Sequence, residues 1–106
     1  MTKGVFFAVC LVTPGLAAAQ DFDNMMKAQD LGSVLASETF CGLSYDQDAI
    51  AAWIDQNTDP ADMGFAASLE TMTMGAAYNL KDMSPSGKTA HCRSITRTAQ
   101  HYGFIQ

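Results

Sequence analysis

The chain has 106 residues, a net charge of −5 at neutral pH and 48% apolar residues, a composition typical of one small globular domain. The negative charge argues against a nucleic-acid-binding protein, because such a protein needs a strongly basic surface to neutralise phosphates. The sequence contains no nucleophile-elbow motif, phosphate-binding glycine loop or CxxC pair, so we expect a protein that is not an enzyme.

The N-terminal stretch has the pattern of an export signal. Lys3 supplies a short basic region, and residues 5–12 (VFFAVCLV) form an apolar run that is shorter than the ~20 residues of a membrane-spanning helix. Residues 13–15 (Thr-Pro-Gly) should break any helix, and residues 17–19 (Ala-Ala-Ala) offer the small side chains that signal peptidase requires. We therefore expect residues 1–19 to be a cleaved signal peptide on a periplasmic or secreted protein without a transmembrane anchor.

Cleavage leaves residues 20–106, which carry a net charge of −6 and two cysteines, Cys41 and Cys92. A domain of this size buries little more than ~60% of its unfolded surface, so an exported chain gains from a covalent crosslink. A Cys41–Cys92 bridge closes a loop of roughly 50 residues, worth about 4 kcal/mol in the chain-entropy model. The alternative is a reactive pair of Cys92 with His91, but adjacent helical residues point about 100° apart. We expect a structural disulfide.

The sequence predicts helices and no strands, because sustained alternation of apolar and polar residues is absent. The first helix is expected over about residues 30–41, with Gly42 as its stop. Glu38 lies at the edge of its apolar face, where it responds to pH, extends to water or pairs with a base of the last helix.

The second and third helices have separate start signals. Ser44 and Gln47 form a capping box for a helix that ends near Asn57, and Asp59 caps a helix with Pro60 at its first position. Apolar residues of the third helix recur at helical spacing, at Phe65, Leu69, Met72 and Ala76. A neighbouring stripe of small residues should permit close approach of another helix, and consists of Gly64, Ser68 and Gly75.

The fourth helix is expected to start with Ser84 as its cap and Pro85 at its first position, and to stop at Gly103. Residues 104–105 (Phe-Ile) should fold back onto the core. The disulfide would then join the first helix to the last, and the fold class is all-α, a small four-helix domain with one disulfide.

Charge is divided unevenly along the chain. Residues 21–80 carry a net charge of −9, whereas residues 81–106 carry +3. Lys88, Arg93 and Arg97 lie on the last helix and form our predicted partner-binding patch. Two interpretations stay open: a solvated face that complements an acidic neighbour, and a docking surface for an acidic protein or envelope component.

Two motifs raise the question of a metal. Met72 and Met74 have the M-x-M spacing of Cu(I) sites, but helical residues two apart diverge by about 200°, so core filling or an adaptable apolar surface are the alternatives. Residues 55–59 (Asp-Gln-Asn-Thr-Asp) begin like a calcium loop, but Pro60 and Ala66 stand where that loop needs Gly and Glu. We expect no bound metal and no cofactor.

Three features of the sequence carry a resemblance to known proteins. They are residues 39–41 (Thr-Phe-Cys), Trp53 in the intervening helices, and residues 84–85 (Ser-Pro) ahead of Cys92. The chain resembles small exported helical proteins of Gram-negative bacteria with a single disulfide. It is more loosely similar to the HdeA-type acid-stress chaperones of the periplasm.

The HdeA-type resemblance implies a chaperone activated in acid. At pH 2 to 3 neutral carboxylates would leave a net charge of about +7, which loosens the helices while the disulfide tethers the chain.

Three functions follow from the sequence. We favour an exported, non-catalytic domain that binds a protein or envelope component. An acid-activated periplasmic chaperone is the alternative, and a Cu(I)-binding protein is the third. The oligomeric state is left open.

Overall fold

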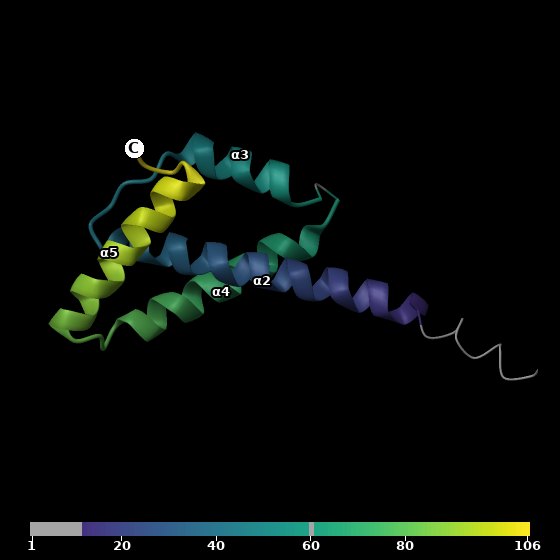
Figure 1. Ribbon diagram of the computed structural model, residues 1–106, viewed down its shortest axis with the longest axis horizontal. Helices are drawn as coiled ribbons and strands as arrows, with labels where there is room; N and C mark the ends of the chain where they lie inside the picture. The colour runs from purple at the N-terminus through teal and green to yellow at the C-terminus, as the bar shows by residue number, and fades with distance from the viewer. Residues whose placement is uncertain (1–11, 60) are drawn as a thin grey trace, which may run out of the picture.

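The computed structural model describes residues 12–59 and 61–106, and within these residues the chain forms four helices and no strand (Figure 1). They are α2 (Val12–Phe40), α3 (Gln47–Asn57), α4 (Met63–Leu80) and α5 (Pro85–Tyr102). The all-α expectation is confirmed. Figure 1 shows α4 running along α2, while α5 leads from the end of α4 back to the start of α3. Lys3 and most of the apolar run of the predicted signal peptide lie outside the described residues.

α2 is much longer than the sequence predicts. It begins at Val12 rather than near Asp30, and it continues through residues 13–15, where we expect a break. Pro14 is tolerated because it lies in the first turn, where backbone N–H groups have no acceptor within the helix. The first turns of α2 project past the other helices (Figure 1).

The predicted stop of α2 is confirmed. The helix ends at Phe40, and Gly42 follows with a φ of 68°, in the left-handed region that favours glycine. The Leu43 N–H donates to the Glu38 carbonyl at 2.8 Å, and the Gly42 N–H donates to the Thr39 carbonyl at 3.2 Å. These bonds satisfy carbonyls of the last turn that have no partner within the helix.

The predicted cap of α3 is wrong. Asp46 caps the helix in place of Ser44, with its Oδ1 accepting from the backbone N–H groups of Asp48 and Ala49 at 2.9 and 3.3 Å. The physical reason is tertiary, because the Asp46 N–H donates to the Phe104 carbonyl at 2.8 Å and so places Asp46 at the helix start.

The predicted cap of α4 is also displaced. Asp62 caps the helix, and its Oδ1 accepts from the Gly64 N–H at 3.0 Å. Asp59 instead accepts from the Ala61 N–H at 2.9 Å in the turn before the helix. Asn24 of α2 donates to the other carboxylate oxygen of Asp62 at 3.3 Å, which favours a start at this residue. Pro60, which the sequence predicts at the first position of this helix, lies outside the described residues.

Both ends of α5 agree with the sequence. The Ser84 hydroxyl accepts from the Gly87 N–H at 3.0 Å, and Pro85 occupies the first turn. Gly103 ends the helix with a φ of 87°. Phe104 then turns back and is almost completely buried in the core.

The core contains side chains from every helix and from the C-terminal segment. Its buried members are Ala28, Leu31, Val34, Tyr45, Phe65, Ile95, Ala99 and Phe104, with α3 contributing partly buried Ile50, Trp53 and Ile54. The closest approach of α2 and α4 is at Gly32, where an added Cβ would lie 3.0 Å from Met72 Cβ and from the Thr73 nitrogen. The predicted close-approach stripe on α4 is wrong, because Gly64, Ser68 and Gly75 are all exposed.

A row of contacting aromatic rings holds α3 and the C-terminal segment against α5. The Tyr102 and Phe104 rings stack with their centroids 5.0 Å apart, and Trp53 meets Tyr102 edge-on at 5.4 Å. Tyr45 lies 5.8 Å from Phe104 on the other side. Aromatic pairs in these geometries stabilise a fold beyond the area that they bury.

Candidate functional site

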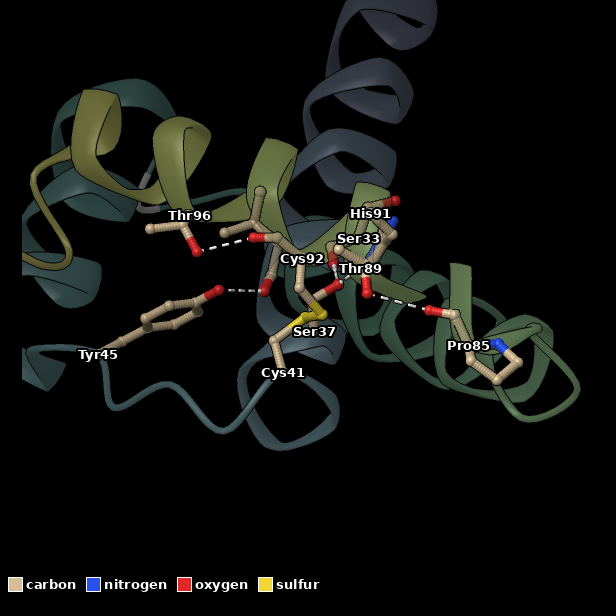
Figure 2. Close-up of a disulfide and its surroundings, with 10 residues drawn as sticks. Ser33, Ser37, Cys41, Tyr45, Pro85, Thr89, His91, Cys92 and Thr96 are labelled. Atoms are coloured by element: carbon tan, nitrogen blue, oxygen red, sulfur yellow. Dashed lines mark hydrogen bonds between the residues drawn. A yellow bond between two sulfur atoms is a disulfide. The ribbon is translucent and has the colours of Figure 1, made fainter. Parts of the chain in front are cut away.

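The Cys41–Cys92 disulfide ties the end of α2 to α5 (Figure 2). The two Cα atoms lie 5.5 Å apart and the two sulfur atoms are bonded, across 51 residues of sequence. The predicted pairing is confirmed. The surface of α5 around Cys92 is therefore held covalently against α2, and side chains near it have a rigid base.

Ser37 and His91 meet beside the disulfide (Figure 2). The buried Ser37 hydroxyl donates to the Ser33 carbonyl at 2.8 Å, and its oxygen lies 2.8 Å from His91 Nε2. Because the hydroxyl has a single hydrogen, the His91 Nε2–H is the donor of the second bond. His91 thus joins α5 to α2 and does not act as a base toward the serine. Nothing in the sequence pattern indicates this contact between residues 54 apart.

The three predicted partner-binding residues do not form one patch. Lys88 extends over Phe40, with its Nζ 4.7 Å from the ring centroid. Arg93 and Arg97 are exposed and line a shallow hollow of about 380 Å³ together with Thr89, Thr96 and the disulfide-bonded Cys92. The structure therefore brings two of the three residues together and places Lys88 toward the end of α2.

The hollow contains two positively charged guanidinium groups, with no described carboxylate beside them. Among the described residues, Lys27 and Asp23 form the only ion pair, at 3.4 Å, so no described carboxylate oxygen lies within 4.0 Å of Arg93 or Arg97. Like charges one helical turn apart repel one another by a few tenths of a kcal/mol. A bound anion would relieve this repulsion.

The threonines beside the arginines use their hydroxyl hydrogens within α5. Thr89 donates to the Pro85 carbonyl at 3.1 Å and Thr96 donates to the Cys92 carbonyl at 2.7 Å (Figure 2). The guanidinium groups of Arg93 and Arg97 are therefore the side-chain hydrogen-bond donors that remain available to a ligand in the hollow. Guanidinium groups match carboxylates and phosphates with paired hydrogen bonds.

Glu38 takes a role that the sequence does not suggest. Its Oε2 accepts from the Tyr45 N–H at 2.7 Å, which fixes the loop between α2 and α3. The Tyr45 hydroxyl in turn donates to the Val34 carbonyl at 2.9 Å. Burial raises the pKa of Tyr45 to about 12, and the nearby Glu38 carboxylate adds to the increase. Glu38 therefore supports the fold and forms no ion pair with α5.

The two methionines of the M-x-M motif point apart. α4 is helical across both residues; Met72 packs against the core, and Met74 is 67% exposed. In the part of the chain that the structure describes, no group of three or more His, Cys, Asp or Glu side chains could hold a metal ion.

Exposed apolar side chains lie on α2 and α4. On α4 they are Met63, Met74 and Tyr78, and on α2 they are Phe22, Met25 and Met26. Glu70 is the one charged residue among the 18 residues of α4. No described helix is both long and apolar enough to cross a membrane.

No protein-family model matches the chain, and neither a curated protein nor a solved structure matches it.

Proposed function

We propose that this chain is an exported, non-catalytic helical domain that binds an acidic segment of another envelope or secreted protein. The observation that carries the proposal is the pair of exposed guanidinium groups on Arg93 and Arg97, which share a hollow and have no described carboxylate within 4.0 Å. In a chain with eleven acidic residues and six basic ones, two adjacent unpaired arginines favour an external acidic ligand.

The spacing of the two arginines defines the ligand. Residues one helical turn apart have Cβ atoms about 5–6 Å from one another, which suits two carboxylates on neighbouring turns of a helix or two residues apart on an extended segment. The disulfide beneath the hollow limits movement of α5. A rigid site loses less conformational entropy when it binds.

The proposed location rests on the leader and on the disulfide. Residues 1–19 have the pattern of a cleaved signal peptide, and the Cys41–Cys92 bond is compatible with an extracellular or periplasmic compartment. Partners would then be proteins or envelope components of that compartment.

An acidic-peptide library tests the proposal. Fluorescently labelled octapeptides with two Glu residues at each possible spacing are titrated with the protein, beside peptides that carry Gln in place of Glu. Two exposed charge pairs of up to about 1 kcal/mol each predict a loss of up to about 30-fold in affinity for Arg93→Gln/Arg97→Gln, and less binding at high salt. Lys81→Gln is the matched control, since Lys81 is exposed and its Nζ lies 5.2 Å from the Tyr78 ring.

The outcome that contradicts the proposal is specific. If no Glu peptide binds the unaltered protein better than it binds the double variant, the hollow is not a site for acidic segments. Equal binding of the Gln peptides would contradict it as well.

One observation favours an acid-activated chaperone as a second candidate. α4 carries a single charged residue and exposes Met63, Met74 and Tyr78. At pH 2 to 3 the exported chain would carry a net charge of about +7, and this self-repulsion would loosen the helices and expose more apolar surface. Light scattering of citrate synthase at pH 2 to 3 tests this candidate. The chain should suppress aggregation there and not at pH 7, and absence of suppression at pH 2 to 3 rules it out.

A further inference from the structure

Methionine is concentrated on the surface of this domain. Of the seven methionines in the chain, all but Met1 lie among the described residues, and none of these belongs to the buried core. This is unusual, because methionine is among the residue types most often found fully buried. Four of them make up most of the six large apolar side chains that are exposed in the described residues. The exposed fractions are 82% for Met63, 67% for Met74, 52% for Met25 and 40% for Met26.

The other two described methionines are shielded by neighbouring residues. Met72 packs against the core at the close approach of α2 and α4, where a Cβ added at Gly32 would lie 3.0 Å from Met72 Cβ. Met83 is half-buried before the start of α5, and its Cγ would lie 3.0 Å from a Cβ added at Gly87. The same chain therefore carries exposed and shielded thioethers, which differ in solvent access and not in chemistry.

An exposed thioether reacts with two-electron oxidants such as peroxides. The sulfur lone pair attacks one oxygen of hydrogen peroxide, the O–O bond breaks, and the products are methionine sulfoxide and water. Sulfur loses two electrons and the peroxide gains them, so no further reactant is needed. Free thiols would compete for the oxidant, but both cysteines of the described residues are bonded to each other. The exposed methionines are therefore the side chains of this surface that are most open to oxidation.

We propose that the four exposed methionines are sites of reversible oxidation by peroxides, and that the fold persists when all four are sulfoxides. Oxidation makes a methionine polar, which disrupts a protein whose methionines lie in the core. The four sulfoxide oxygens would instead lie in water, so none would be a buried polar group without a hydrogen-bond partner. The proposal is independent of the acidic-segment site on α5, whose described lining residues include no methionine.

Peptide mapping by mass spectrometry during treatment of the exported chain with hydrogen peroxide measures the rate at each methionine. Met63 and Met74 should be oxidised first and Met25 and Met26 next, while Met72 and Met83 should be about tenfold slower than Met63, because susceptibility follows exposure. Circular dichroism should show unchanged helix content once the four exposed methionines are oxidised. Methionine sulfoxide reductases specific for each of the two sulfoxide epimers should then restore the original mass.

Leucine variants test the assignment, because leucine keeps the apolar volume of methionine and cannot be oxidised in this way. Met63→Leu with Met74→Leu should lower the fast uptake from four oxygen atoms to two, and Met72→Leu, the matched control, should leave it at four. Oxidation of Met72 and Met83 as fast as Met63 overturns the proposal. Loss of helix content during the fast uptake, or sulfoxides that the reductases cannot repair, overturns it as well. Peptide binding at Arg93 and Arg97 is measured on untreated protein, so failure of this inference is distinguishable from failure of the proposed function.

Discussion

Replacing Tyr45 with phenylalanine should change how stability depends on alkaline pH. The side chain is 5% exposed, and its hydroxyl donates to the Val34 carbonyl at 2.9 Å. Burial raises its pKa from 10.0 to about 12, with a further contribution from Glu38. Because the folded state favours the protonated phenol, the stabilisation is complete below pH 10 and is lost as the pH rises toward 12.

The magnitude follows from the two pKa values. The pKa of Tyr45 is 10.0 in the unfolded state and about 12 in the folded state, so its phenol ionises first in the unfolded state. By pH 11 this ionisation lowers the free energy of unfolding by about 1.4 kcal/mol. Tyr45→Phe should cost about 1 kcal/mol at pH 7, because one buried hydrogen bond is lost. The variant has no phenol at this position to ionise. The two proteins should therefore become equal in stability between pH 10 and pH 11.

Guanidinium chloride unfolding at pH 7, 9, 10 and 11 measures the effect. Trp53 reports on the fold, because its ring lies 5.4 Å from that of Tyr102 across α3 and α5. Burial also raises the pKa of Tyr102, but this contribution is common to both proteins and cancels in the difference. Tyr78→Phe, at an exposed position, is the control. A stability difference that stays constant from pH 7 to pH 11 would refute the reasoning.

Four further variants test the packing, each by the same unfolding measurement at pH 7. Gly32→Ala should lower the free energy of unfolding by about 1–3 kcal/mol, because the new methyl group meets α4 backbone at 3.0 Å. Gly75→Ala should raise it by about 0.5–1 kcal/mol, because an added Cβ there meets no atom within 4 Å. Loss of stability in both variants would contradict this account. Cys41→Ser with Cys92→Ser should lose about 4 kcal/mol, and an unchanged midpoint would mean that the bridge does not restrain the unfolded chain. Phe104→Ala should lose about 3–5 kcal/mol, and a loss below 1 kcal/mol would show that the C-terminal segment is not part of the core.

Local signals in the sequence were sufficient to place a helix end where only one nearby residue could act as the cap or the stop. Ser84 and Pro85 start α5 as predicted, and Gly103 ends it, because cap chemistry and positive φ depend only on adjacent residues. The Cys41–Cys92 pair was predictable because cleavage of the leader would leave no other cysteine.

The starts of α3 and α4 required information from distant residues. Ser44 and Asp46 are both good caps, and the hydrogen bond from Asp46 to Phe104 favours the second. Asp59 and Asp62 compete in the same way, and the contact with Asn24 of α2 favours Asp62. Sequence patterns contain neither tertiary contact.

The candidate site was predicted only in part. The sequence indicates Arg93 and Arg97 by their charge alone, and their hollow beside the disulfide depends on how α5 lies against α2. Charge also groups Lys88 with them, but its position over Phe40 depends on the end of α2 beneath it. The contact of Ser37 with His91 has no sequence signal at all.

If the chain is exported as proposed, the position of the bonded cysteines constrains when the domain completes its fold. A chain that crosses a membrane N-terminus first releases α2 and Cys41 early, but Cys92 and Phe104 follow only near the end of translocation. Until then the apolar face of α2 has only part of its native partners, and contacts distant in sequence form slowly. Under the proposed export, oxidation of the two cysteines would therefore be a late event, and the incompletely translocated chain would be the species most exposed to proteolysis and aggregation.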